Sequence, residues 1–223
     1  MAVFIVVPVL NEASVLKTVI SELLRDYPHV VVIDDGSTDG SLKTVEGLPV
    51  FCLRHLINRG QGAALQTGLT FALKQGAEII VTFDSDGQHD PKDIETLLEP
   101  IRSGDADVVL GSRFLKKGSP LPWSRRLLLT GGVFFTRATT GLPVTDTHNG
   151  LRAFSRKAAS TIHFTMDRMA HASELFEIIQ KEKLRYQEVP VTIRYTPYSL
   201  RKGQSSWNLF RILWSLIERS LSK

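Results

Sequence analysis

The sequence predicts an α/β protein with a mainly parallel central sheet and helices on both of its faces. Short apolar runs alternate with longer segments in which apolar residues recur at helical spacing, through the first half of the 223-residue chain. The first run, Val3–Val7, is apolar without a break, which is typical of a strand buried on both faces of a parallel sheet. With 43% hydrophobic residues, the chain can bury one core.

Five apolar runs predict the strands of the first half, and the segments between them predict its helices. The expected strands are Val3–Val7, Val30–Ile33, Val50–Leu53, Ile79–Phe83 and Val108–Leu110. Helices are expected around 15–24, shortly after Asp39, over Ala63–Lys74 and after Asp90. Asp90 and Pro91 are residue types that favour the N-cap and the first position of a helix. The only cysteine, Cys52, lies in the third run and is expected to be buried.

Beyond Gly111 the alternation becomes less regular. Helices are expected around Trp123–Thr139 and Met169–Glu182, followed by a half-buried strand in which Val189, Val191, Ile193 and Tyr195 alternate. From about Ser206 we expect an amphipathic helix. The expected organisation is therefore one domain over residues 1–205 and a C-terminal helix over residues 206–223. This helix either packs on the domain, lies at a membrane interface or docks to a membrane partner.

Charge is distributed unevenly along the chain, whose net formal charge is +4. Residues 1–107 hold 8 Lys or Arg against 16 Asp or Glu, whereas residues 108–223 hold 19 against 7. Residues 108–145 contain six basic side chains and no acidic one. Such a segment is either a solvated basic face or a surface for an anionic substrate, a nucleic acid or a membrane. A nucleic acid is disfavoured, because the acidic strand ends would repel its phosphates.

Polar side chains follow three of the predicted strands where each strand ends. Asn11 and Glu12 follow the first strand, Asp34 and Asp35 the second, and Asp84 and Asp86 the fourth. Carboxyl ends of parallel strands meet at one edge, where α/β proteins bind ligands, so these groups should converge. Asp84 and Asp86 share one face of an extended strand, and such a pair suits Mg²⁺ or Mn²⁺. Asp34 could cap the turn after its strand, and His89 is expected to point away from the pair.

Five short motifs stand in order along the chain. They are Val7-Pro8-Val9-Leu10-Asn11-Glu12, Asp34-Asp35-Gly36-Ser37, Asn58-Arg59-Gly60-Gln61-Gly62-Ala63, Asp84-Ser85-Asp86-Gly87-Gln88 and Gly111-Ser112-Arg113. Together they resemble the family-2 inverting glycosyltransferases of the GT-A fold, and among these the dolichyl- and polyprenyl-phosphate sugar transferases. The resemblance covers nearly the whole chain. It implies the GT-A nucleotide-diphospho-sugar transferase fold.

The resemblance also implies roles for the residues at the strand ends. The nucleotide-sugar donor would be bound by Pro8, Leu10, Glu12, Ile33, Asp35, Asp84, Ser85 and Asp86. Asp84, Asp86 and Gln88 would hold Mg²⁺ or Mn²⁺ on the donor diphosphate, which gives Asp86 a catalytic role. The segment Asn58–Gly60 would form a turn under the nucleotide.

Arginines would bind the remaining anionic groups. By the same resemblance, Arg113 would contact the transferring phosphates and Arg125 the lipid phosphate, with Arg126 as its competitor for that role. Arg201 matches, with an offset of one residue, a loop that closes on the nucleotide in related enzymes. Ser206 stands where those enzymes have a lysine.

We therefore expect a metal-dependent inverting transferase that moves a hexose from a UDP- or GDP-sugar to undecaprenyl or dolichyl phosphate. A first alternative is transfer to a carbohydrate hydroxyl in cell-surface polysaccharide synthesis. The segment Asp146–Arg152 resembles an Asp…Gly-Phe-Arg segment of the family, and this resemblance would make Asp146 the general base for a hydroxyl acceptor. A lipid phosphate needs no strong base. A second alternative is a non-catalytic sugar-nucleotide-binding subunit of a membrane complex.

The expected location is cytoplasmic and peripheral, at the cytoplasmic face of a membrane. A single cysteine fits a reducing compartment, and the N-terminus lacks the pattern of a signal peptide. No apolar stretch approaches the ~20 residues of a membrane span. Attachment would then depend on the basic segment, on the C-terminal helix or on a small integral membrane partner subunit.

Overall fold

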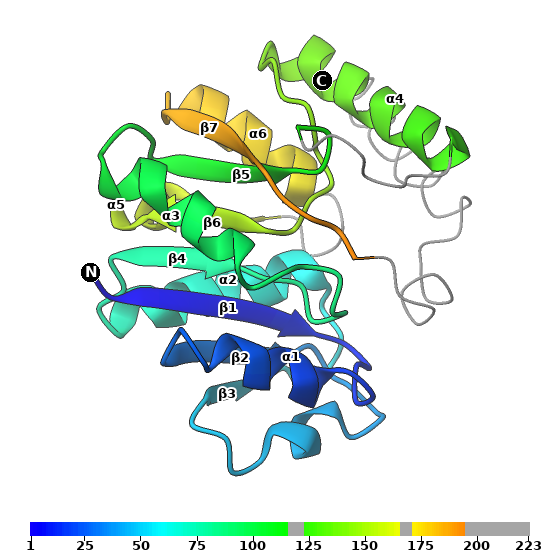
Figure 1. Ribbon diagram of the computed structural model, residues 1–223, viewed down its shortest axis with the longest axis vertical. Helices are drawn as coiled ribbons and strands as arrows, with labels where there is room; N and C mark the ends of the chain where they lie inside the picture. Colours follow the sequence, from blue (N-terminus) through cyan, green and yellow to red (C-terminus); the bar gives the residue numbers. More distant parts are fainter. Residues whose placement is uncertain (116–122, 166–170, 195–223) are drawn as a thin grey trace.

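The computed structural model describes residues 1–115, 123–165 and 171–194. Its elements alternate between strand and helix along the first half, as predicted (Figure 1). In chain order they are β1 (Val3–Val9), α1 (Leu16–Leu23), β2 (His29–Asp34), the 3-10 helix η1 (Ser41–Val45), β3 (Phe51–Arg54), α2 (Gln61–Lys74), β4 (Ile79–Thr82), α3 (Asp93–Arg102), β5 (Val108–Ser112), α4 (Trp123–Thr140), β6 (Arg152–Ser155), α5 (Arg156–Thr161), α6 (His171–Lys181) and β7 (Tyr186–Pro190).

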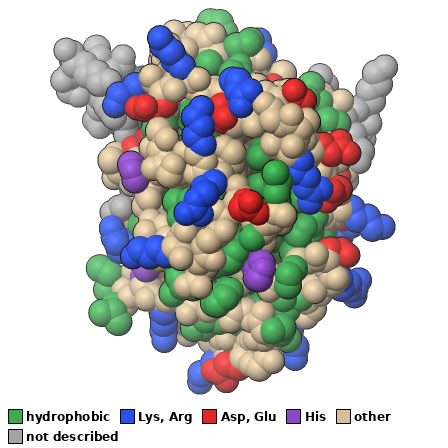
Figure 2. Space-filling model, turned by 90° about the vertical axis from the view of Figure 1, so that its left-hand side faces the viewer, with side chains coloured by type: hydrophobic (Ala, Val, Ile, Leu, Met, Phe, Trp, Pro, Cys, Tyr) green, Lys and Arg blue, Asp and Glu red, His purple; other side chains and the backbone are tan. Residues whose placement is uncertain are grey.

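The strands form a mainly parallel seven-stranded sheet in the order β3-β2-β1-β4-β6-β5-β7. All described pairs are parallel except those of β6, which runs antiparallel to β4 and β5. The carboxyl ends of the other strands therefore lie together on the right of Figure 1. This carboxyl-terminal end of the sheet is called the common edge below, in contrast to the lateral edge strands. Figure 2 shows the opposite edge, where basic, acidic and apolar side chains are interspersed.

Helices α1 and α3 cover one face of the sheet and α2, α5 and α6 cover the other, because each of these helices presents apolar side chains to it. One core cluster joins the sheet to α1 and α3 through Leu16, Val19, Ile20, Leu23, Ile94, Leu97, Leu98 and Ile101. The other joins it to α2, α5 and α6 through Ala64, Leu65, Leu69, Ala72, Ala158, Ala159, Leu175, Phe176 and Ile179. Gly68 lets α2 approach closely, since a Cβ there would lie 2.3 Å from Val6 Cγ1. The predicted class and layering are confirmed.

Two local predictions were wrong. Cys52 is exposed rather than buried, because β3 is an edge strand whose outer residues face solvent. Helix α3 begins at Asp93 with Lys92 as its N-cap, so Asp90 does not cap it. Asp90 Oδ1 instead accepts the Lys92 N–H at 3.1 Å in the preceding turn.

The second half differs more from the prediction. The strand β6 and the short helix α5 were not predicted, and β7 begins three residues before the expected Val189. Val191 and Ile193 are buried beyond the end of β7, whereas Tyr195 and the expected helix over 206–223 lie outside the described residues. Within the described ranges, no helix is both long and apolar enough to cross a bilayer.

Candidate active site

The loop that follows β2 and the loop that follows β3 are held together by buried carboxylates at the common edge. Asp34 Oδ1 accepts the Ser37 N–H at 2.9 Å, which confirms that Asp34 caps the turn after its strand. Asp35 is 3% exposed and binds the 55–60 loop. Its Oδ1 accepts from His55 Nδ1 at 2.7 Å and from the Arg59 N–H at 3.0 Å, and its Oδ2 accepts from the Gly60 N–H at 2.6 Å. The segment Asn58–Gly60 is thus a fixed turn beside β2.

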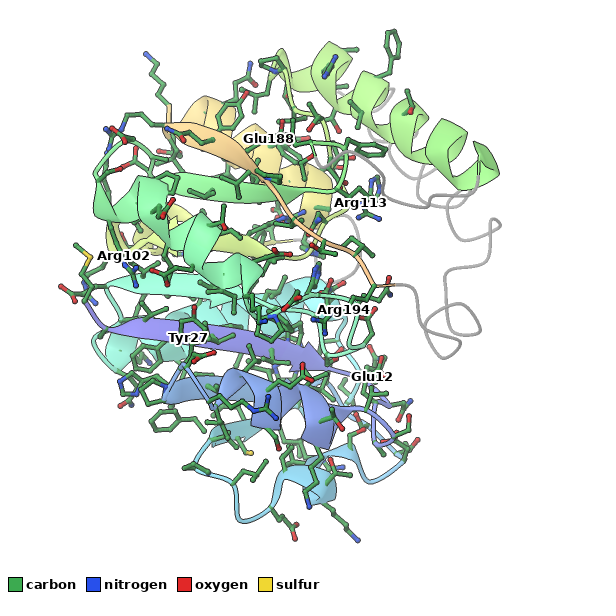
Figure 3. All side chains as sticks on the ribbon, in the orientation of Figure 1. Glu12, Tyr27, Arg102, Arg113, Glu188 and Arg194 are labelled. Atoms are coloured by element: carbon green, nitrogen blue, oxygen red, sulfur yellow. The ribbon has the colours of Figure 1, made fainter. Side chains whose placement is uncertain are left out.

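The residues that follow β1 extend this half of the site. Glu12 is buried, its backbone N–H donates to Ser41 Oγ at 2.8 Å, and Figure 3 shows it at the common edge. Leu10 is 38% exposed at the rim. Pro8 is buried, and its carbonyl accepts from the buried Ser85 hydroxyl at 2.8 Å. The Ser85 side chain therefore links the ends of β1 and β4.

Ile33 was predicted to contact the donor, but its side chain is fully buried on the α2 face of the sheet. A Cβ on Gly68 of α2 would lie 2.8 Å from Ile33 Cδ1. A ligand at the sheet edge could therefore meet only the backbone of Ile33.

Asp84 lies in a close-fitting polar environment after β4. Its Oδ1 accepts from Gln61 Nε2 and its Oδ2 from His89 Nε2, both at 3.1 Å. His89 is buried and points at Asp84, so the prediction that it points away was wrong. A Cβ on Gly150 would lie 2.2 Å from Asp84 Oδ2, so any larger residue at position 150 would displace the Asp84 carboxylate.

Asp86 lies beside Asp84 and is held by Gln88. The Gln88 backbone N–H donates to Asp86 Oδ1 at 3.0 Å, and Gln88 Nε2 donates to Asp86 Oδ2. Burial and the charge of Asp84 raise the pKa of Asp86. Burial alone would also raise the pKa of Asp84, but the hydrogen bond from His89 and the charges of His89 and Arg152 lower it. Repulsion between the two carboxylates is what a bound cation would offset.

The donor set fits a divalent cation whose coordination is completed by substrate. Asp84, Asp86 and Gln88 offer hard oxygen atoms, and Mg²⁺ is typically held by one or two carboxylates together with substrate phosphates. Among the described residues, no group of three or more His, Cys, Asp or Glu side chains is placed to hold a metal alone. The predicted ligands therefore lie together, and a metal bound there would need further oxygen atoms from a ligand.

The β5 end of the edge is basic, and Figure 3 shows Arg113 there. Arg113 is buried, and both its backbone N–H and its Nε donate to Asp146 Oδ2, at 3.2 and 2.6 Å. Asp146 Oδ1 accepts the His148 N–H at 3.2 Å, so both carboxylate oxygens accept hydrogen bonds. Arg125 and Arg126 fall in the first turn of α4, and their side chains lie outside the described part of the chain, as does all of Arg201.

Arg152 on β6 is a site residue to which the sequence analysis gave no role. It is 4% exposed, and its strand lies between β4 and β5. Arg152 Nε donates to the Asn149 carbonyl at 2.9 Å and its Nη2 to the Thr147 carbonyl at 3.3 Å. Burial lowers the pKa of Arg152 to about 10, partly offset by the charges of Asp84 and Asp146. Arg152 remains a cation at neutral pH. It lies between the acidic half of the site, which contains Glu12, Asp35, Asp84 and Asp86, and the basic half, which contains Arg113.

A cavity of about 180 Å³ adjoins the basic half. Its lining residues come from the end of β5, from α4 and from the loop before β6, and they are Phe114, Thr130, Val133, Arg137 and Thr145. The lining combines apolar, hydroxyl and guanidinium groups. An amphipathic ligand portion fits such a lining.

Comparison with known proteins identifies the family. The family model for glycosyl transferase family 2 matches residues 4–162. The chain is a family 2 glycosyltransferase. The match spans every element from β1 to α5, and with them both halves of the site.

Named relatives resemble this glycosyltransferase over nearly its full length. It is 32% identical to a UDP-N-acetylglucosamine–dolichyl-phosphate N-acetylglucosaminyltransferase of Methanococcus voltae, over 99% of this chain and 97% of that one. It is 29% identical to an undecaprenyl-phosphate mannosyltransferase of Micrococcus luteus, over 86% and 83%.

A solved structure shows the fold. Glucosyl-3-phosphoglycerate synthase from Mycobacterium tuberculosis, in complex with Mn²⁺, UDP and phosphoglyceric acid, superimposes with a TM-score of 0.70 at 20% identity. The alignment covers 96% of the glycosyltransferase and 78% of that chain. The predicted GT-A fold is confirmed.

Proposed function

We propose that this glycosyltransferase moves a hexose from a UDP- or GDP-sugar to a polyprenyl phosphate, with Mg²⁺ or Mn²⁺ and with inversion at the anomeric carbon. The names of the relatives in Methanococcus voltae and Micrococcus luteus support a lipid-phosphate acceptor. The Mn²⁺ and UDP named for the fold neighbour support a metal-bound nucleotide donor. Reaction at the cytoplasmic face of a membrane, with peripheral attachment, is part of the proposal.

The observation that favours a phosphate acceptor is the pairing of Asp146 with Arg113. Transfer to a sugar hydroxyl needs a base to take the proton, and Asp146 was the predicted base. Its two oxygens already accept three hydrogen bonds, two of them from Arg113. A carboxylate held in this way fixes the position of the Arg113 guanidinium. A phosphate monoester is largely ionised near neutral pH, and it can attack without such a base.

The acidic half would bind and orient the donor. Glu12 and Asp35 are acceptors for nucleoside hydroxyl and N–H groups, and the Leu10 side chain forms the rim. Asp84, Asp86 and Gln88 would hold the metal against the donor diphosphate. A metal bound there supplies positive charge that stabilises the leaving nucleotide diphosphate.

The basic half would bring the acceptor phosphate to the donor. Arg113 would contact the transferring phosphates, and Arg125 or Arg126 on α4 would bind the lipid phosphate, because guanidinium groups match phosphate geometry. The cavity beside α4 would take the first part of the isoprenoid chain against the apolar side chains of Phe114 and Val133. The proposal also includes closure of Arg201 on the nucleotide. It further includes docking of residues 206–223, for which the sequence predicts a helix, to the membrane or to a small membrane partner.

The test is a transfer assay with radiolabelled UDP- and GDP-sugars, Mg²⁺ or Mn²⁺, and undecaprenyl or dolichyl phosphate in detergent. Label should enter the organic phase with one donor. Asp86→Asn should lower the rate by at least about a hundredfold, because metal-dependent charge stabilisation is worth several kcal/mol. The control Asp26→Asn, on an exposed turn after α1, should keep the wild-type rate. An equal loss in both variants, or no lipid product with any donor, would refute the proposal.

A further inference from the structure

We propose that Glu188 of β7 is a positioning residue: acting through the loop that contains Thr145 and Asp146, it sets the orientation of the Arg113 guanidinium. The inference rests on the proposed function, which makes Arg113 a phosphate ligand. No motif in the sequence includes Glu188, and it lies 42 residues beyond Asp146 in the chain.

Glu188 binds this loop through its carboxylate. Its Oε1 accepts from the backbone N–H groups of Thr145 and Asp146 at 2.8 and 3.1 Å, and its Oε2 accepts from the Thr145 N–H at 2.9 Å. Hydrogen bonds to a charged acceptor are roughly twice as strong as those between neutral groups. Glu188 is therefore a strong and half-buried anchor for two consecutive amides.

The second contact connects the loop to Arg113. The Asp146 carboxylate accepts from the Arg113 backbone N–H and from its Nε, at 3.2 and 2.6 Å. The pairing of β5 with β7 places Leu110 opposite Glu188, so Glu188 lies on the strand beside β5, and Arg113 follows directly after β5. Figure 3 shows Glu188 and Arg113 in the same upper part of the molecule. A shift of the Asp146 backbone would be passed directly to the Arg113 side chain.

Other contacts keep the loop in place when Glu188 is changed. Arg137 Nε of α4 donates to the Val144 carbonyl at 2.8 Å, and the Ser112 and Thr145 hydroxyls lie 2.6 Å apart. We therefore expect Glu188→Gln to fold with its loop attached. The glutamine places an NH₂ group where Oε2 accepted a hydrogen bond, so Thr145 and Asp146 must move slightly. This substitution tests orientation rather than overall folding.

The first test observes Arg113 directly by ¹⁵N NMR of the arginine Nε–H groups, with Arg113→Lys to assign its signal. In the wild type and in the matched control Glu182→Gln, whose residue is exposed just beyond α6, the Arg113 Nε–H should exchange slowly with water. In Glu188→Gln it should exchange about tenfold faster, as expected when a charge-assisted hydrogen bond weakens. An unchanged exchange rate in Glu188→Gln would refute the proposal, whether or not the protein transfers sugar.

The second test measures the kinetic consequence. Glu188→Gln should raise the KM for polyprenyl phosphate by about tenfold while the KM for the nucleotide-sugar changes by less than about twofold. In an Arg113→Lys background the same substitution should have an effect below about twofold, since residues acting in one chain are not additive. Equal effects in both backgrounds would mean that Glu188 only stabilises the fold. Absence of wild-type transfer would refute the proposed function alone, because the NMR result decides the positioning role independently.

Discussion

Replacing Gly150 by alanine would perturb the proposed metal site through a single added methyl group. The Cβ would lie 2.2 and 2.4 Å from the two Asp84 carboxylate oxygens, far closer than real contacts. Gly150 does not have a left-handed backbone conformation, so the substitution adds no backbone strain. Asp84 must move, and it then loses the geometry of its contacts with Gln61 and His89.

The magnitude follows from those two contacts. Hydrogen bonds to a charged group contribute about 1.5–3 kcal/mol each, and overpacking a well-filled site costs about 1–3 kcal/mol. The Asp84 side chain is 29% exposed, so it can partly relax toward solvent. We therefore expect a destabilisation of about 1–3 kcal/mol, which lowers Tm by about 2–12 °C in a chain of this size. Affinity for Mn²⁺ with the donor should fall by about tenfold to a hundredfold, as when supporting residues of a metal site are changed.

The assays are thermal unfolding and titration of Mn²⁺ in the presence of UDP. Gly131→Ala is the matched control, because a Cβ there meets open space and α4 gains helix propensity. It should leave the Mn²⁺ affinity unchanged and Tm unchanged or higher. In an Asp84→Ala background, Gly150→Ala should cost little stability, since the clashing carboxylate is gone. A wild-type Tm and Mn²⁺ affinity in Gly150→Ala would refute the close contact and the role assigned to Asp84.

Two further predictions concern titratable groups other than Asp84 and Asp86. Burial lowers the pKa of His148 below 6.5, so the folded state binds fewer protons than the unfolded state. The free energy of unfolding should therefore be highest above pH 6.5 and decline as the pH falls through the folded-state pKa. Urea unfolding between pH 8 and pH 5 should show this dependence of the unfolding free energy on pH, and His148→Gln should weaken it. An unchanged dependence in His148→Gln would contradict the role assigned to His148. Burial and the charge of Asp34 raise the pKa of the Cys52 thiol, yet Cys52 is exposed on β3. A thiol reagent should therefore modify the native protein, more slowly than free cysteine at pH 7.5 and faster at higher pH; modification that requires denaturant would contradict the exposed position.

Patterns within short stretches predicted the parallel half of the molecule. The apolar runs predicted β1, β2 and β4, and the polar residues after them predicted the acidic half of the site. These features depend only on neighbouring residues, which is why they could be inferred. By contrast, Arg152–Ser155 forms β6 although only two of its four residues are apolar. Its strand character comes from pairing with β4 and β5, which no local pattern contains.

Contacts over long separations could not be predicted either. The Arg113–Asp146 pair joins residues 33 positions apart, and the Glu188 contact adds 42 more. His89 contacts Asp84 because the chain turns through Gly87, whose φ is +74°, so strand alternation does not continue to His89. Cys52 is exposed because β3 lies at the sheet edge, and strand order is a property of the whole fold.

The most direct test of the central claim compares a lipid phosphate with the corresponding lipid alcohol as acceptor. Wild-type protein, the labelled nucleotide-sugar that gives product and Mn²⁺ would be incubated with polyprenyl phosphate or with polyprenol of the same length, and product would be measured by extraction and ³¹P NMR. We predict a sugar phosphodiester from polyprenyl phosphate and no product from polyprenol. Transfer to the alcohol at a comparable rate would contradict the account, because it would require the base that Asp146, bound by Arg113, is not placed to provide.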